Sequence, residues 1–148
     1  MLNPLNGIEF FHVGVGVPDL DKALHELGAA LGLSWSPVFE SRMHEWPLRI
    51  ALSKQGPPYY EVIEAPVGSP WCPRDGENMV HFGFWSDDVP LDRDRLLALG
   101  FQVEVDGVPL GYQFVYLRGP CGGLRIELSG TQGPSLWRTH ERMLGKRN

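Results

Sequence analysis

The chain has 148 residues, which suffices for one domain or for two small modules that share a core. A net charge of −5 and the lack of a Lys/Arg cluster argue against nucleic-acid binding, so we expect no such partner. No stretch approaches the roughly 18 apolar residues that span a bilayer, and residues 1–7 do not resemble a signal peptide, so no membrane partner is expected. Two cysteines without a C-x-x-C motif favour a cytoplasmic location.

The first half of the chain predicts one strand, one helix and three further strands. Residues 10–17 are apolar and β-branched, and the strand closes at Pro18. Asp19 is the predicted N-cap of a helix whose apolar residues recur at helical spacing until Gly32. The three further strands are predicted at residues 36–40, 48–52 and 59–64.

The second half repeats this order after a connector rich in Pro, Gly and Asp at residues 66–78. Its predicted elements are a strand at 79–85, a helix at 91–99, and strands at 101–105, 113–118 and 124–128. A short helix at 135–144 is expected at the surface or in a dimer contact.

Each half is therefore a βαβββ module, about 8–66 for module one and about 79–130 for module two, followed by a tail at 131–148. One crossover helix per half followed by a meander predicts an α+β fold rather than a doubly wound sheet. We expect a single domain in which the paired modules form a curved mixed sheet around a trough.

The two halves also repeat a histidine and a glutamate. His12 opens the run His-Val-Gly-Val-Gly-Val, and His81 opens His-Phe-Gly-Phe. Glu61 lies 49 positions after His12, and Glu127 lies 46 positions after His81, each within a predicted strand. A repeat that duplicates a His and a Glu on strands indicates a two-fold arrangement that brings four metal-binding groups together.

Strand alternation is consistent with this interpretation. In the two relevant strands of the second half, the apolar residues share one parity while the His and the Glu occupy the other. His12 shares its parity with two glycines, which leaves room for a ligand. Glu64 is the rival of Glu61, but it lies on the parity of Val62.

Two imidazoles and two carboxylates suit one divalent ion, either Zn, Co, Ni or Mn, or Fe(II). Open coordination positions would let the ion hold a carbonyl or carboxylate oxygen of a small-molecule substrate, which makes the adjacent C–H more acidic. A nearby carboxylate can then remove or return that proton.

Two segments resemble the vicinal oxygen chelate superfamily, which includes glyoxalase I, methylmalonyl-CoA epimerase, extradiol dioxygenases, and bleomycin- and fosfomycin-resistance proteins. Residues 12–20, His-Val-Gly-Val-Gly-Val-Pro-Asp-Leu, resemble its opening strand and helix cap, and residues 121–128, Cys-Gly-Gly-Leu-Arg-Ile-Glu-Leu, resemble its last strand. The resemblance covers roughly residues 8–130. It implies paired βαβββ modules around a divalent metal whose ligands are His12, Glu61, His81 and Glu127.

Residues 61–70, Glu-Val-Ile-Glu-Ala-Pro-Val-Gly-Ser-Pro, are similar to the methylmalonyl-CoA epimerase and glyoxalase-like branch. That similarity implies an isomerase, epimerase or lyase that transfers a proton through an enolate, acting on an acyl-CoA or another thioester. Glu127 would transfer the proton together with Glu45, and Glu40 is the alternative second group. A homodimer is expected, and whether the site lies within one chain or across the dimer stays open.

Two other functions are compatible with the resemblance. An extradiol dioxygenase uses two His and one carboxylate on Fe(II), so a fourth ligand at Glu61 argues against it. A protein that sequesters a drug without metal often lacks the ligand set, whereas all four positions are occupied here.

Two further groups of residues have open interpretations. The tryptophans either line a cleft for a planar substrate or pack in the interior; they are Trp35, Trp46, Trp71 and Trp85. Three arginines either bind an anionic group or lie at the surface, namely Arg49, Arg118 and Arg125.

Overall fold

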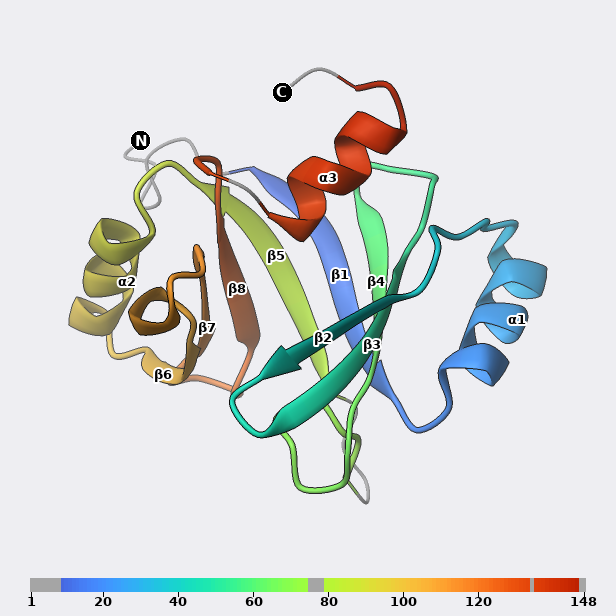
Figure 1. The fold of residues 1–148 in the computed structure, drawn as a ribbon. Coiled ribbons are helices and arrows are strands. Elements are labelled where there is room, and N and C mark those ends of the chain that lie inside the picture. Colours follow the sequence, from blue (N-terminus) through green and yellow to red (C-terminus); the bar gives the residue numbers. More distant parts are fainter. Residues whose placement is uncertain (1–8, 75–78, 134, 147–148) are drawn as a thin grey trace. The chain divides into compact units, whose positions relative to one another are not determined.

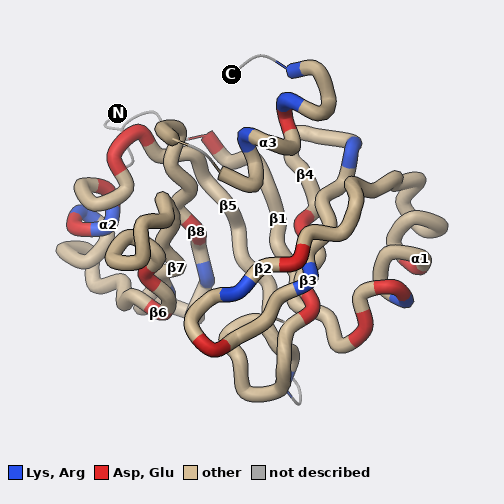
Figure 2. Tube along the Cα trace, viewed as in Figure 1, with Lys and Arg blue, Asp and Glu red and all other residues tan. Residues whose placement is uncertain are grey.

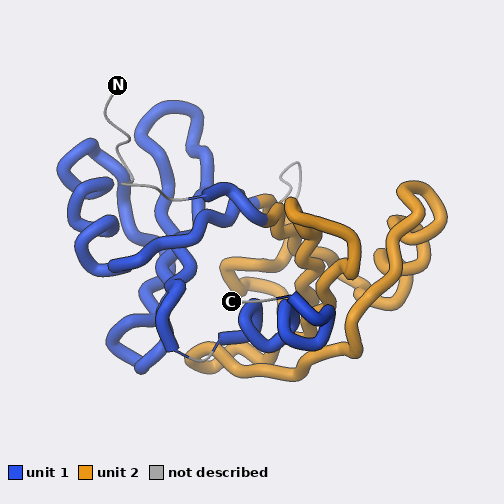
Figure 3. The backbone as a smooth tube through the Cα atoms, turned by 90° about the horizontal axis from the view of Figure 1, so that it is seen from above, with its two compact units in different colours: residues 1–11, 81–148 blue, residues 12–80 orange. Residues whose placement is uncertain are grey.

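The computed structural model describes residues 9–74, 79–133 and 135–146. The chain divides into two compact units, one of residues 12–80 and one of residues 1–11 with 81–148, and Figure 3 colours them separately. Following the order of the two modules along the chain, we call residues 12–80 the first unit and residues 1–11 with 81–148 the second unit; in the key of Figure 3 they are unit 2 (orange) and unit 1 (blue), respectively. Residues 1–7, which the signal-peptide argument used, and residues 75–78 of the connector lie outside the described part. None of the helices in that part is long and apolar enough to cross a membrane.

The elements follow the predicted order in both halves (Figure 1). The first half contains β1 (Phe10–Val17), α1 (Leu20–Leu31), β2 (Phe39–Met43), β3 (Trp46–Leu52) and β4 (Tyr59–Glu64). The second half contains β5 (Val80–Ser86), α2 (Val89–Ala98), β6 (Gln102–Asp106), the short 3-10 helix η1 (Val108–Leu110), β7 (Phe114–Arg118), β8 (Arg125–Gly130) and α3 (Leu136–Met143). The α+β class and the two βαβββ modules are confirmed.

One local prediction was wrong, and one short element was missed. The strand expected at 36–40 begins only at Phe39. Ser36 already donates its backbone N–H to the carbonyl of Leu52, but Pro37 has no N–H with which to continue the pairing. The helix η1 was not predicted, because a single turn has too few residues to show helical periodicity.

Each unit contains a mixed four-stranded sheet. The strand order is β2-β3-β4-β1 in the first unit and β5-β8-β7-β6 in the second. The pairs β1–β4 and β5–β8 are parallel, and the other pairs within each unit are antiparallel. In each module the first strand pairs with the last. The two run parallel because a helix follows the first strand, and the three remaining strands form an antiparallel meander.

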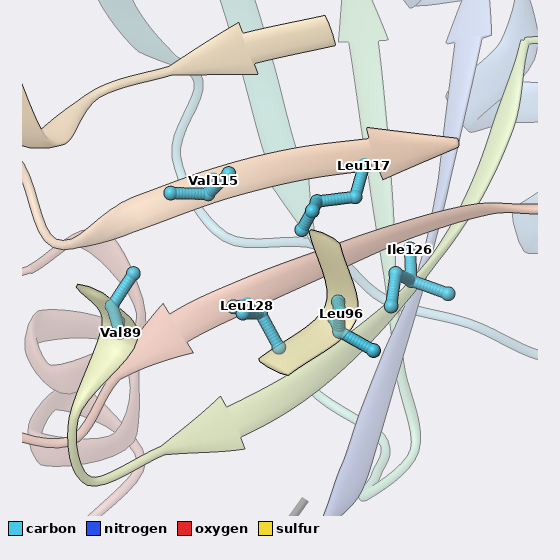
Figure 4. Close-up of a cluster of buried hydrophobic side chains, with 6 residues drawn as sticks. All are labelled: Val89, Leu96, Val115, Leu117, Ile126 and Leu128. Carbon is cyan, nitrogen blue, oxygen red and sulfur yellow. The ribbon is translucent and has the colours of Figure 1, made fainter. Parts of the chain in front are cut away.

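A helix covers one face of each sheet and creates a hydrophobic core there. In the first unit, Leu20 and Ala23 of α1 pack with Ala51 and Val62 of the sheet. In the second unit, Figure 4 shows the equivalent cluster, and its members are Val89, Leu96, Val115, Leu117, Ile126 and Leu128. Burying a side chain of this size contributes roughly 2 kcal/mol, so these clusters hold the sheets rigid and leave the opposite faces for other uses.

An ionic cluster, in which only Arg125 is buried, joins three strands of the second unit. Arg125 of β8 donates from Nη2 to Oε2 of Glu104 on β6 over 2.6 Å, and Arg118 of β7 also donates to Glu104. The Arg125 side chain is only 1% exposed. Burial by itself would raise the pKa of Glu104, but the hydrogen bonds from Arg125 and Arg118 outweigh it and lower that pKa below its ordinary value.

We expect Glu104→Gln to lower the free energy of unfolding at pH 7 by on the order of 2 kcal/mol, because it removes the carboxylate that accepts a hydrogen bond from the buried Arg125, while solvent at the partly exposed Glu104 weakens the pair. The lowered pKa means that this stabilisation is complete above the ordinary glutamate pKa and is lost as the pH falls through the folded-state value. Urea unfolding of wild type and variant from pH 7 to pH 3 measures both effects, and the two curves should converge in acid.

Asp94→Asn is the matched control, because the Asp94 side chain is 66% exposed and its partner is the neighbouring Arg93. A surface pair of this kind is worth about 0–1 kcal/mol. A Glu104→Gln effect no larger than that of Asp94→Asn, or a difference that does not shrink in acid, would contradict the prediction.

Candidate functional site

The first unit places His12 and Glu61 beside each other on the face that α1 does not cover. The parallel register aligns His12 with Tyr59 and Gly14 with Glu61, so His12 and Glu61 have the same orientation. The Nε2 atom of His12 lies 3.6 Å from Oε1 of Glu61. Both residues are buried, with exposures of 0% and 4%.

The second unit repeats this arrangement. Gly83 of β5 aligns with Glu127 of β8, and alternation places His81 on the same face as Gly83. The Nε2 atom of His81 lies 3.4 Å from Oε2 of Glu127, and both residues are buried. Each unit thus contains a buried His–Glu pair on two adjacent parallel strands.

The strands that carry the two histidines have no charged residue, and Figure 2 shows β1 and β5 without any red or blue. In each unit the charge next to the histidine therefore comes from the neighbouring strand, through Glu61 or Glu127. A glycine lies opposite each of these glutamates, Gly14 in the first unit and Gly83 in the second. Because glycine has no side chain, no larger group from the adjacent strand shields the carboxylate.

The donor set fits a divalent cation. Each of the four residues, His12, Glu61, His81 and Glu127, offers one ligand atom, an imidazole nitrogen or a carboxylate oxygen. Nitrogen and oxygen donors of this kind are common ligands of Zn, Mn, Co, Ni and Fe(II) in proteins. The burial of the two carboxylates also supports a metal site, because buried carboxylates are normally paired or bound to a metal.

The expectation that small residues beside His12 leave room for a ligand needs one correction. A Cβ atom at Gly16 would lie 1.6 Å from the carbonyl oxygen of Trp71. The glycine is therefore required by the close approach of the chain near Trp71, and the backbone N–H of Gly16 donates to the carbonyl of Met79 over 2.8 Å. For Gly14, which lies opposite Glu61, the expected room for a ligand stays a prediction.

Glu64, the sequence rival of Glu61, lies on the helix-covered face. Its Oε2 accepts a hydrogen bond of 2.7 Å from the backbone N–H of Leu20 at the start of α1. Arg49 of β3 also donates to this carboxylate, and that hydrogen bond raises the pKa of Arg49 above its ordinary value. Glu64 and Arg49 therefore anchor α1, and neither belongs with the His12–Glu61 pair.

The two candidates for the second proton-transfer group lie in different environments. Glu40 pairs across β2 and β3 with Arg49, so it shares the helix-covered face. Glu45 is exposed in the two-residue turn between Met43 and Trp46. Strand β3 pairs with β4 only from Arg49 onward, so the turn projects beyond that pairing. Leu52 is the residue of β3 opposite Glu61, and Trp46 lies six positions before it, about 20 Å of extended chain.

The tryptophans mainly serve packing. Trp35 donates from its indole N–H to the carbonyl of Leu24 in α1, and Trp71 is only 3% exposed. Trp85 has Phe11 stacked on its ring at 4.0 Å and the guanidinium of Arg138 at 4.6 Å from its centroid. Only Trp46, partly buried beside the β2–β3 turn, remains without such a packing role among the described contacts.

Arg125 does not lie at the surface, where an isolated arginine is expected by default. It shares the face of Glu127, is 2% exposed, and its guanidinium lies 5.5 Å from the ring centroid of Tyr116. The ring of Tyr116 in turn lies 4.8 Å from that of His81. Sequence analysis missed Tyr116 and Glu104. The available signal for the tyrosine was alternation in the run 113–118, where Tyr116 and Val115 point to opposite faces of the strand.

The tail packs more closely than a surface helix would. Trp137 and His140 of α3 are buried, with exposures of 4% and 1%, and Trp137 contacts Phe11 edge to face. The cysteines form no bridge, since Cys72 is buried as a free thiol and Cys121 is exposed.

Comparison with known proteins agrees with the fold. The sequence profile of the glyoxalase/bleomycin resistance protein/dioxygenase superfamily matches residues 11–116. The chain therefore belongs to this superfamily. No curated protein matches the sequence.

Several solved structures share the fold at low sequence identity. A methylmalonyl-CoA epimerase variant of Streptomyces coelicolor, in complex with 2-nitronate-propionyl-CoA, is 23% identical over 84% of this chain and 97% of its own, with a TM-score of 0.63. A hypothetical protein from Bacillus halodurans is 14% identical over 87% and 98%, with a TM-score of 0.63. The methylmalonyl-CoA epimerase of Mycobacterium tuberculosis is 20% identical over 93% and 97%, with a TM-score of 0.59.

Proposed function

We propose that this protein is a divalent-metal-dependent isomerase or epimerase, or a lyase of the glyoxalase I type, which moves a proton next to a carbonyl group of a thioester. The metal ligands in this proposal are His12, Glu61, His81 and Glu127. The observation that carries it is the buried His–Glu pair on adjacent parallel strands, present once in each unit.

The course of the chain supports a single ion shared by the two pairs. The borders between the units fall between Phe11 and His12 and between Val80 and His81. Each histidine of the proposed ligand set is thus bonded directly to a residue of the other unit. A repeat in which each half supplies half of a ligand set is economical, because neither pair alone offers the three or four ligands that a stable site needs.

The substrate class is proposed from the family and the fold. The proteins of similar fold include methylmalonyl-CoA epimerases solved with acyl-CoA compounds, one of them with methylmalonyl-CoA and NH4+. We therefore propose an acyl-CoA or a related thioester as the substrate of this chain.

A bound divalent ion would polarise a carbonyl or carboxylate oxygen and so acidify the neighbouring C–H. The protein side chains then have two tasks. Glu127, buried beside His81, is held in place to accept or return the proton on one side of the substrate carbon. Glu45, on the projecting turn, is the proposed second group, because an epimerase needs a proton donor and acceptor on each side of the carbon. Glu40 pairs with Arg49 and so lies on the opposite side of the sheet from Glu61, which makes it the less suitable choice.

The metal proposal predicts that the demetallated protein binds one divalent ion per chain, and that Glu61→Ala weakens the binding by at least about 100-fold through loss of a ligand. Isothermal titration with Zn²⁺, Mn²⁺ and Co²⁺, together with elemental analysis of the purified protein, measures this. Glu64→Ala is the matched control, since Glu64 lies on the same strand but contacts α1; it should lower stability and leave metal affinity unchanged.

His81→Ala should likewise weaken metal binding through loss of a ligand. Its matched control is His25→Ala, because His25 lies exposed on α1, and this variant should leave metal affinity unchanged. Absence of stoichiometric metal uptake by wild type would favour a sequestering protein instead. Fe(II) binding that survives Glu61→Ala, with consumption of oxygen, would favour an extradiol dioxygenase.

The proton-transfer proposal predicts that Glu45→Gln lowers kcat/KM for epimerisation by about 10²–10⁴ while the metal content stays at the wild-type level. The variant should still exchange the substrate proton with solvent deuterium, because Glu127 can act alone on one side. Glu40→Gln should change kcat/KM by less than about twofold, since Glu40 lies on the opposite side of the sheet from Glu61. Equal losses in both variants, or no loss in Glu45→Gln, would exclude Glu45 from the reaction.

A further inference from the structure

Ser129 of β8 has a buried hydroxyl group that makes no hydrogen bond within the described part of the chain. The residue is 5% exposed, and alternation along β8 places it on the face of Glu127. An unsatisfied buried hydroxyl is unusual, because a polar group removed from water without a partner costs free energy. A ligand that binds on this face would supply the missing partner.

The neighbours of Ser129 define what that ligand must be. Trp85 on β5 and Phe114 on β7 are its register partners, so the hydroxyl lies between two aromatic side chains. Both faces of the Trp85 ring are already covered, by Phe11 and by Arg138. The aromatic rings therefore act as walls, and the hydroxyl is the group left to make a specific contact.

The charges on this face vary along β8. Arg125 lies two residues before Glu127 and Ser129 two residues after it. Nearby, Arg138 donates to the carbonyl of Thr131 and to Glu141, so its charge is already paired. An anionic substituent at Ser129 would lose its hydration without gaining a free cation, which disfavours it. A neutral oxygen substituent meets no such penalty.

We propose that Ser129 is a specificity-determining residue whose hydroxyl binds a neutral hydroxyl or carbonyl substituent of the substrate. The inference rests on the proposed function, because it takes Glu127 as the proton-transfer group. Glu127 and Ser129 lie on one face, two residues or about 7 Å apart along the strand, so the two side chains can reach neighbouring carbons of one acyl chain. The preferred substrates are thus thioesters with an oxygen on the third carbon of the acyl chain.

The first test requires no substrate. Ser129→Ala removes an unsatisfied polar group and should raise the Tm of the ligand-free protein. Ser86→Ala is the matched control, because Ser86 is an equally buried strand serine in the same unit whose hydroxyl donates to Asp92 over 2.6 Å. This control should lower the Tm. A lower or unchanged Tm for Ser129→Ala would overturn the inference, since it would show that the hydroxyl is already satisfied.

The second test compares 3-hydroxybutyryl-CoA with butyryl-CoA as probes for exchange of the C2 proton with deuterium from solvent, using metal-loaded protein. Wild type and Ser86→Ala should prefer the hydroxylated probe by about tenfold or more in kcat/KM, because a hydrogen-bonding site rejects a partner that lacks the group. Ser129→Ala should reduce this preference to less than about twofold.

The outcomes separate the two proposals. Exchange of both probes at equal rates by wild type, or an undiminished preference in Ser129→Ala, overturns the role of Ser129 and leaves the proposed function intact. Absence of exchange with either probe, together with absence of metal binding, overturns the proposed function and the inference that rests on it.

Discussion

Each unit of this protein is organised around a histidine and a glutamate buried side by side on two parallel strands. Burying a carboxylate away from water costs several kcal/mol unless a partner compensates, so the pair must be held by the surrounding structure. The helix on the opposite face provides that support, because its apolar packing against the sheet fixes both strands. Parallel pairing then sets the register that brings His12 next to Glu61 and His81 next to Glu127.

The two units surround their pairs with different chemistry. In the first unit the neighbours of Glu61 on the same face are apolar, for example Leu52 and Ile63, and the ion pair of Arg49 lies on the other side of the sheet. In the second unit the face of Glu127 carries Arg125, Tyr116 and Ser129 as well. The polar groups around the His–Glu pair are thus concentrated in the second unit, so the repeat is symmetric in its His–Glu pairs and asymmetric in the residues that surround them.

Much of the local structure could be predicted from single residues and their spacing. Asp19, Asp88 and Ser135 accept hydrogen bonds from the first turns of the three helices, which is the role that such residues prefer. Alternation along single strands also separated Glu61 from Glu64. The failures occurred at short elements such as η1 and at the start of β2, where one proline decides whether pairing continues.

The sequence by itself determined the element order, the repeat, and the parity of each residue within its own strand, because these depend on neighbours along the chain. Only the tertiary structure decided which residues meet across strands. Burial of Arg125 depends on Glu104, 21 positions away, and the need for glycine at position 16 depends on the backbone of Trp71. Contacts of this kind arise from strand register and loop path, and the pattern along one strand shows which face a residue occupies but not which residue lies opposite it on the next strand.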